Sequence, residues 1–306
     1  MDTVLLITQA VNGLQLGVLL FLLSAGLTLT FGIMDLINLA HASFYMLGAF
    51  FGATVTIYTG SFTLGFFAAI IAVLIVAWII EKVIISQLYT RDHLDQLLAT
   101  FGLILIADTL VHIIWGPAGL AIALPPLLQG QVTFGGVTLP SFRILIIGVG
   151  LLVALGLYWL VNHTRTGMLI RAGASNRRML NNLGVDVGSL FAAVFCMGAA
   201  LAGVAGILIT PITEASIGMG NDIIITAFVV VIIGGIGSIK GAFIAAIIIG
   251  MIDTFGRAFL DQLFMTVMPA ETAETAAPAV SAMLIYLLMA IILSLRPAGL
   301  FPPKLR

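Results

Sequence analysis

The sequence predicts an all-α, polytopic integral membrane protein built from nine or ten helical pieces. Of its 306 residues, 61% are hydrophobic and 8% are charged, whereas soluble domains are about half apolar and about a quarter charged. Apolar runs long enough to cross roughly 30 Å of hydrocarbon recur along the chain. The runs are continuous rather than alternating, which excludes a membrane β-barrel. We therefore expect one transmembrane domain over residues 1–306.

The expected spans follow one another with short connections. They lie near 5–31, 35–57, 62–85, 95–115, 142–162, 189–210, 222–236, 241–263 and 278–295. The seventh is short and runs into a glycine-rich segment, which predicts a half-helix or a helix broken near 234–241. No basic segment precedes the first run, so this span is expected to be retained rather than cleaved as a signal peptide.

The basic residues are distributed unevenly over the loops that this arrangement creates. Ten of the 12 Lys and Arg residues fall on one side: Lys82, Arg91, Arg165, Arg171, Arg177, Arg178, Lys240, Arg296, Lys304 and Arg306. Because Lys and Arg favour cytoplasmic loops, the N-terminus is expected outside and the C-terminus in the cytoplasm. The net charge of −1 argues against nucleic acid as a partner.

Two connections are long enough to carry structure of their own. In the outer loop 116–140, alternating apolar residues flank Gly135-Gly136, which predicts a β-hairpin. In the cytoplasmic loop 163–188, the pattern predicts a short amphipathic helix over Arg177–Leu183 that ends at Gly184. Such a helix either rests on lipid headgroups or docks a cytoplasmic protein.

Polar residues cluster in the stretch FGIMDLINLAHASFYMLGAFFG, at the start of the second span. If this stretch is helical, Asn38 and His41 share a face, with Tyr45 one turn further on. A polar group in hydrocarbon is costly unless it finds a partner or lines a wet path. Asn38, His41, Ser43 and Tyr45 are therefore candidate translocation residues, or else they hydrogen-bond a neighbouring helix.

Two further pairs of ionisable residues lie within spans. Asp108 and His112 are spaced i,i+4 and can pair, with a pathway role as the alternative. Asp253 and Arg257 have the same spacing and are expected to form a self-neutralising couple.

The glycine-rich segment offers a different kind of polar group. Gly234, Gly235 and Gly237 interrupt a helix, and the backbone groups released there could face a polar solute.

The sequence lacks the motifs of a chemical site. It has no GxxxxGK[ST], so it is not expected to bind ATP itself. It also has no HExxH and no GxSxG. Cys196 is the only cysteine, which excludes an internal disulfide and a cysteine metal cluster. We expect no enzyme activity, no cofactor and no metal, because an intramembrane enzyme would need a nucleophile and a base that the sequence does not bring together.

Four segments carry a family resemblance. INLAHASFYMLGAF (Ile37–Phe50) resembles the NxAHGxFYMLGAY signature of bacterial branched-chain amino-acid ABC transporter permeases, and GGIGSIKGAFIAAIIIG (Gly234–Gly250) resembles their GGxGSxxGAxxGA signature. RTGMLIRAGASNRRMLNNLGVDV (Arg165–Val187) is similar to their cytoplasmic coupling segment. LRPAGLFPPKLR (Leu295–Arg306) is similar to their RPxGLF tail. The segments occur in the family's order.

The resemblance implies a partnership as well as a fold. Such permeases import amino acids, urea, short amides or aromatic acids across the bacterial inner membrane. This chain resembles the smaller permease of a pair, which implies a second homologous permease, two cytoplasmic ATPase subunits, a periplasmic binding protein and the lipid bilayer as partners. The residues implied to contact an ATPase are Arg171, Ala174, Ser175, Asn176, Arg177, Arg178, Met179, Leu180, Leu183 and Gly184.

The chain departs from the family pattern at several positions. Ala42 stands where glycine is common, Lys240 stands where proline is common, and no acidic residue lies near Ser175 and Asn176. These departures bear on the cargo and on the ATPase contact rather than on the fold. The alternative function is a proton-coupled secondary transporter, in which His41, Asp108 and His112 would act as relay groups.

Overall fold

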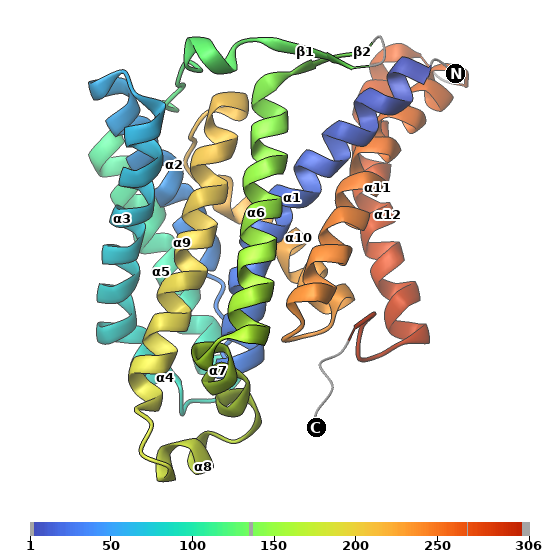
Figure 1. Ribbon diagram of the computed structural model, residues 1–306. Helices are drawn as coiled ribbons and strands as arrows, with labels where there is room; N and C mark the ends of the chain where they lie inside the picture. The colour runs from blue at the N-terminus through green and yellow to red at the C-terminus, as the bar shows by residue number, and fades with distance from the viewer. Residues whose placement is uncertain (1–2, 135–136, 268, 302–306) are drawn as a thin grey trace.

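The computed structural model describes residues 3–134, 137–267 and 269–301, and nearly all of this chain is helical. Long helices run between two opposite ends of the molecule (Figure 1). The N-terminus and a small β-hairpin lie at one end, and the C-terminus and two short helices lie at the other. Termini at opposite ends agree with the odd number of apolar segments that the sequence predicts.

Among the described residues, eight helices are long and apolar enough to cross a membrane. They are α1 (Thr3–Met34), α2 (His41–Thr59), α3 (Phe62–Ile80) with its continuation to Leu88, α5 (His93–Trp115), α6 (Ser141–His163), α9 (Val187–Thr213), α11 (Ile239–Met265) and α12 (Ala270–Leu295). A ninth apolar helix, α10 (Met219–Gly234), has 16 residues and is about 24 Å long at 1.5 Å per residue. The prediction of an all-α polytopic protein with a short seventh apolar helix is confirmed.

The expected count of nine or ten helical pieces is too low. The loop after α6 contains two helices, α7 (Arg165–Ser175) and α8 (Arg177–Asn182), where the sequence predicted one. In addition, α3 passes through a π-helical turn, η1 (Glu81–Ile85), into the short α4 (Ser86–Leu88). The hydrophobic pattern does not reveal this change of pitch, because apolar residues continue through it.

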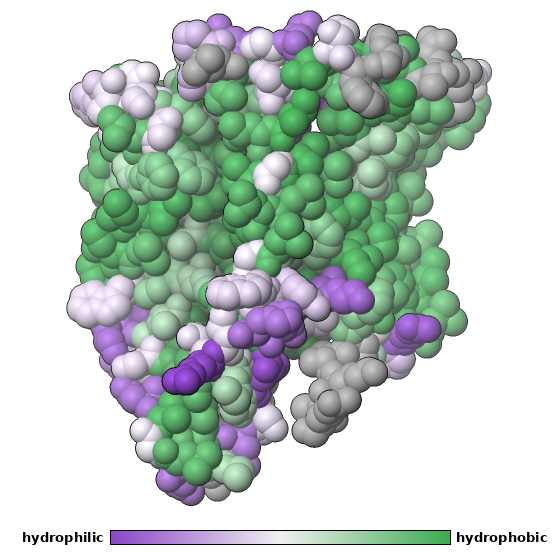
Figure 2. All heavy atoms as spheres, viewed as in Figure 1, coloured by the Kyte–Doolittle hydropathy of each residue, from purple (hydrophilic) through white to green (hydrophobic). Residues whose placement is uncertain are grey.

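Helix α1 forms the centre of the bundle and packs against α9, α10, α11 and α6. Its residues from Val18 to Leu23 are all buried, as expected for a helix that is apolar on every side. The outer helices α3, α5, α6 and α12 instead expose many large apolar side chains. Figure 2 shows the resulting hydrophobic surface between two ends where hydrophilic residues gather.

The predicted hairpin is present. Strands β1 (Gln131–Phe134) and β2 (Val137–Pro140) pair antiparallel, with Val132 opposite Leu139, and this confirms the hairpin at the end that carries the N-terminus. The expected turn residues Gly135 and Gly136 lie outside the described residues. The same outer loop contains the 3-10 turn η2 (Pro126–Leu128) and pairs through Leu120 with Ala215, just before α10.

Candidate functional site

The chain leaves the helical conformation between α1 and α2. Asp35 has a φ of +52°, and two buried side chains of α5 satisfy the backbone that follows. The Ile37 N–H donates to Gln96 Oε1 at 3.0 Å, and the Leu39 N–H donates to Thr100 Oγ1 at 3.2 Å. We call residues 35–40 the α1–α2 junction. Sequence reasoning missed these supports, although two polar residues spaced i,i+4 in an apolar run were a usable signal.

Asn38 lies in this junction and not on a helix face. The expectation that Asn38 and His41 share a helical face is therefore wrong, because α2 begins only at His41. Asn38 is fully buried, and neither its side-chain oxygen nor its nitrogen has a hydrogen-bond partner among the described residues. Burying an amide without a partner is costly. The Asn38 side chain is therefore available to hydrogen-bond a water or a solute, or to gain a protein partner in a second conformation of the junction.

His41 is held by the neighbouring helix. Its Nε2 lies 3.1 Å from the carbonyl oxygen of Leu23 on α1, and its ring packs where a Cβ at Gly26 would stand. Ser43 and Tyr45 follow on the first turns of α2 and are buried. Of the two roles expected from the sequence, the geometry of His41 fits the bridge between helices.

Of the two ionisable pairs expected within spans, one forms in the structure and the other does not. Asp108 on α5 accepts a hydrogen bond of 2.8 Å from the Asn221 amide, near the start of α10. Asp108 does not pair with His112, which is also on the described helix α5 and whose side chain is exposed, so that expectation is wrong. Arg257 does donate to Asp253 at 3.0 Å, which confirms the couple on α11. His41 and Asp108 thus contact different residues, Leu23 and Asn221, and the described contacts do not join the proposed relay of His41, Asp108 and His112 into one network.

The glycine-rich segment does break the helix. α10 ends at Gly234 and α11 begins at Ile239, and Gly235 and Gly237 have φ values of +100° and +81°. The C-terminal segment covers this break, because the N–H groups of Leu300 and Phe301 donate to the carbonyls of Ile233 and Gly234 at 2.8 and 3.1 Å. These two carbonyls are therefore already hydrogen-bonded. Residues 302–306 of the tail motif lie outside the described residues.

The α7–α8 hairpin (residues 165–184) projects from the end of the bundle that carries the C-terminus (Figure 1). Side chains fix both helix starts. Thr164 Oγ1 accepts from the Gly167 N–H at 3.0 Å, and Asn176 Oδ1 accepts from the Met179 N–H at 2.9 Å. Gly184, with a φ of +82°, ends the hairpin. A helix in this position was predicted, but α7 was missed, because its cap is a single threonine after an apolar run.

The hairpin contains a groove of about 220 Å³. It is lined by Ala172, Ser175, Asn176, Met179, Leu180 and Leu183. Leu180 is only 4% exposed, whereas Met179 and Leu183 are 61% and 71% exposed. The three residues therefore do not form one exposed face as expected, because Leu180 packs inward and only the other two are free for a partner. Arg171 and Ala174 are exposed nearby, and the side chains of Arg177 and Arg178 are outside the described set.

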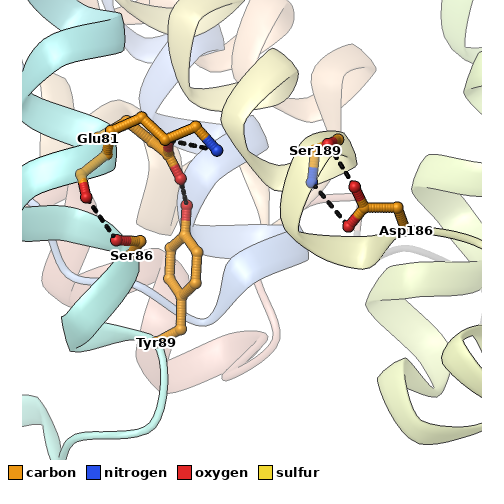
Figure 3. A network of polar contacts seen from close by, with 6 residues as sticks. Glu81, Ser86, Tyr89, Asp186 and Ser189 are labelled. Atoms are coloured by element: carbon orange, nitrogen blue, oxygen red, sulfur yellow. Dashed lines mark hydrogen bonds and ion pairs between the residues drawn. The ribbon is translucent and has the colours of Figure 1, made fainter.

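A polar cluster lies behind the hairpin (Figure 3). Glu81, on the π-helical turn η1, is 1% exposed. It accepts a hydrogen bond of 2.8 Å from the Tyr89 hydroxyl and lies 3.9 Å from Lys82 Nζ. The Tyr89 ring meets Phe191 of α9 edge-on at 5.3 Å. Sequence reasoning missed Glu81, although an acidic residue at the end of a long apolar run was the available signal.

The cluster is continuous with the hairpin. The side chains of Leu180, Leu190 and Phe191 converge on Gly173 of α7, each within 3.7 Å of the position that a Cβ there would take. At the start of α9, Asp186 accepts hydrogen bonds from the hydroxyl and the N–H of Ser189. These bonds lower the pKa of the exposed Asp186 carboxyl. The Tyr89–Phe191 contact thus joins α4 and η1 to α9, and α9 packs beside α7 and α8 around Gly173.

An apolar bundle with a buried, partly unwound junction at one helix start and a grooved hairpin at one end defines a polytopic membrane transport protein. Residues 9–293 match the family described as branched-chain amino acid transport system / permease component, and the chain belongs to this family. This family assignment confirms the resemblance carried by the four motifs.

Curated relatives align with most of the chain. BraD of Pseudomonas aeruginosa, a high-affinity branched-chain amino acid transport system permease protein, is 34% identical over 270 residues, which cover 83% of this chain and 87% of that protein. LivH of Escherichia coli K12, described in the same words, is 30% identical over 280 residues, with 85% and 88% covered. A probable branched-chain amino acid transport permease, LivH of Methanocaldococcus jannaschii, is 28% identical over 255 residues, with 81% and 80% covered. No solved structure matches the chain.

Proposed function

We propose that this chain is the permease subunit of a binding-protein-dependent ABC importer that carries branched-chain amino acids, or closely related small polar solutes, into the cytoplasm. The observation that carries this proposal is the family match, which extends over residues 9–293 and so includes both the junction and the hairpin. The chain would perform no chemistry, and ATP hydrolysis would take place on separate subunits.

The proposed function also implies partner subunits and an orientation in the membrane. A second homologous permease would complete the path, two ATPase subunits would bind from the cytoplasm and a binding protein would deliver the cargo from the periplasm. The basic residues favour an inner-membrane protein with its N-terminus outside. In this orientation the α7–α8 hairpin faces the cytoplasm, where Met179 and Leu183 would contact an ATPase subunit.

The junction is the proposed moving part of the path. The side chain of Asn38 would hydrogen-bond a solute or a water, which would take the place of the partners it lacks. His41, Ser43 and Tyr45 would hold the start of α2. Asp108 and His112 on α5, and Gly234, Gly235 and Gly237 at the break, would shape the path walls. Irregular backbone supports this role, because within a membrane it persists only when it is buried in protein or lines a cavity.

Competition in uptake tests the cargo. The permease would be reconstituted in proteoliposomes with the proposed ATPases, second permease and binding protein, and uptake of labelled L-leucine would be measured. An excess of unlabelled L-isoleucine or L-valine should suppress uptake, whereas urea and acetamide should not. Suppression by urea or acetamide alone would assign a different cargo to the same machinery.

A labelling experiment tests the orientation. A cysteine introduced at Ser175 in a Cys196→Ser background should react with a membrane-impermeant thiol reagent only from the cytoplasmic side. Reaction from the periplasmic side of intact cells would reverse the proposed topology.

A further inference from the structure

A cavity of about 590 Å³ lies between α1, α11 and α12, away from the junction and the hairpin. Its volume is in the roughly 300–1,000 Å³ range of small-molecule sites. The charged part of its lining consists of Asp253, Arg257, Asp261 and Glu274, and Leu16 and Ala258 contribute to its apolar part. Charged groups of both signs therefore share one cavity with an apolar wall.

The charges on α11 follow one face of the helix. Asp253, Arg257 and Asp261 are spaced i,i+4,i+8, so they form a row about 12 Å long at 1.5 Å per residue. The row begins near the middle of α11 (Ile239–Met265) and runs toward the end of the bundle that carries the N-terminus. Ionisable groups inside a membrane span are costly and typically mark a solute path.

The cavity is closed on its inner side by direct backbone contact. A Cβ on Gly250 of α11 would lie 2.4 Å from both the Gly13 carbonyl oxygen and the Gly17 nitrogen of α1, so no side chain fits between these helices. On its other flank, Ser281 of α12 donates a hydrogen bond of 3.0 Å to the Asp253 carbonyl. The cavity therefore ends less than one turn below Asp253 and extends to the exposed Glu274 at the opposite end.

Several polar groups in the cavity have unused hydrogen-bonding capacity. Asp261 Oδ1 is buried without a hydrogen-bond partner among the described residues. Arg257 donates its Nε–H to Asp253, which uses one of the five N–H donors of a guanidinium. Pro278 of α12 cannot donate the usual helical hydrogen bond to the Glu274 carbonyl. Both a cationic donor and anionic acceptors are thus available to a ligand.

We propose that this cavity receives the charged head group of a zwitterionic α-amino acid on its way through the permease. Arg257 binds the carboxylate, because a guanidinium can hold a carboxylate with two parallel hydrogen bonds. Asp261 and Glu274 bind the ammonium, and Leu16 and Ala258 contact the aliphatic side chain. The inference rests on the proposed function and narrows its cargo, because neutral urea or an amide would leave these charges without counterparts.

Protection of a cysteine placed in the cavity tests the proposal. In the assembled complex with a Cys196→Ser background, the Ala258→Cys variant should react with a methanethiosulfonate reagent, and L-leucine should slow this reaction. Leucinamide and 4-methylpentanoate, which lack the carboxylate and the ammonium of leucine respectively, should protect only at about tenfold or higher concentration. Leu263→Cys, exposed on α11 but not in the cavity lining, is the matched control and should not be protected.

Charge variants supply the second arm. Arg257→Gln, Asp261→Asn and Glu274→Gln should each raise the half-protecting leucine concentration about tenfold or more, with Arg257→Lys milder than Arg257→Gln. Glu271→Gln, one turn away on α12 and outside the cavity lining, should leave it unchanged.

The possible outcomes separate this proposal from the proposed function. If the complex takes up leucine but leucine protects Ala258→Cys neither with nor without ATP, the cavity is not a cargo site although the function stands. If acetamide protects and leucine does not, both the zwitterion site and the amino-acid cargo are wrong. Loss of protection in the Glu271→Gln variant as well would indicate a general distortion of α12 and overturn the assignment to individual residues.

Discussion

Tyr89 donates a hydrogen bond of 2.8 Å to Glu81, and this bond links the end of α4 to the π-helical turn in a region where Glu81 is buried. The same tyrosine packs edge-on against Phe191, which in turn lies beside Leu180 near Gly173. The α7–α8 hairpin therefore packs beside α9 near Gly173, and α9 contacts Tyr89, which is bonded to the π-helical turn. π-helical turns of this kind often occur at functional sites.

Removing the hydroxyl should destabilise this region. Tyr89→Phe leaves the buried Glu81 oxygen without its donor, and the expected loss is about 1–3 kcal/mol of stability. A fall in the thermal unfolding midpoint in detergent measures it. Ser86→Ala is the matched control, because the Ser86 hydroxyl bonds only the Lys82 carbonyl on an exposed helical turn, and it should change the midpoint little. Equal effects of the two variants would contradict a special role for the Tyr89–Glu81 bond.

Close glycine contacts give a second prediction. A Cβ on Gly32 would lie 2.2 Å from the Cα of Gly237, so Gly32→Ala forces α1 away from the loop before α11 and should cost about 1–3 kcal/mol. Gly148→Ala on α6 meets nothing within 4 Å and should be neutral or slightly stabilising, because alanine favours a helix. Thermal unfolding of both purified variants decides. A Gly32→Ala protein as stable as the wild type would refute the contact.

Substitutions of Asn38 and His41 should have different effects, one on uptake and the other on stability. His41→Ala removes the contact with the Leu23 carbonyl and leaves space beside Gly26, so it should lower stability and yield. Asn38→Ala removes a buried amide that has no partner among the described residues, so it should preserve folding and reduce uptake. The paired measurement is the unfolding midpoint and the leucine uptake rate of each variant. Normal uptake by Asn38→Ala would remove this residue from the path.

The hairpin groove predicts where an ATPase subunit binds. Leu183→Asp places a charge on a leucine that is 71% exposed, so the permease should still insert while co-purification of the ATPase falls about tenfold or more. Val132→Asp, on the β1–β2 hairpin at the opposite end of the bundle, is the matched control and should retain the ATPase. Leu180→Asp is not a clean test, because this side chain packs inside the hairpin. Full retention of the ATPase by Leu183→Asp would move the contact elsewhere.

The sequence predicted the elements that depend on local pattern. The apolar runs located the apolar helices of the described chain, although the expected start of α2 was six residues early and that of α12 eight residues late. The Val-Thr-Phe and Val-Thr-Leu alternation located β1 and β2. Asp253 and Arg257 pair as their spacing predicted, because i,i+4 neighbours on a helix meet without help from the rest of the fold.

Features that depend on distant partners could not be predicted in this way. The α1–α2 junction unwinds because Gln96 and Thr100, about 60 residues away, supply hydrogen-bond partners. Asp108 turns to Asn221, which lies 113 residues further on, instead of to His112. Leu180 turns inward and packs beside Leu190 and Phe191 of α9, next to Gly173. No local pattern contains these contacts, so the path residues placed on an ideal helix were misplaced relative to one another.

The energy source for uptake distinguishes an ABC importer permease from a proton-coupled transporter. Proteoliposomes that contain the whole complex would be supplied with binding protein and labelled L-leucine. ATP would be placed either on the membrane side that carries the ATPase subunits or on the opposite side, and each experiment would be run with and without a protonophore. We expect uptake that requires ATP at the ATPase subunits, persists when the proton gradient is collapsed and is lost in the Leu183→Asp variant. Leucine uptake driven by a pH gradient, by this permease without ATPase subunits, would contradict it and favour a proton-coupled transporter.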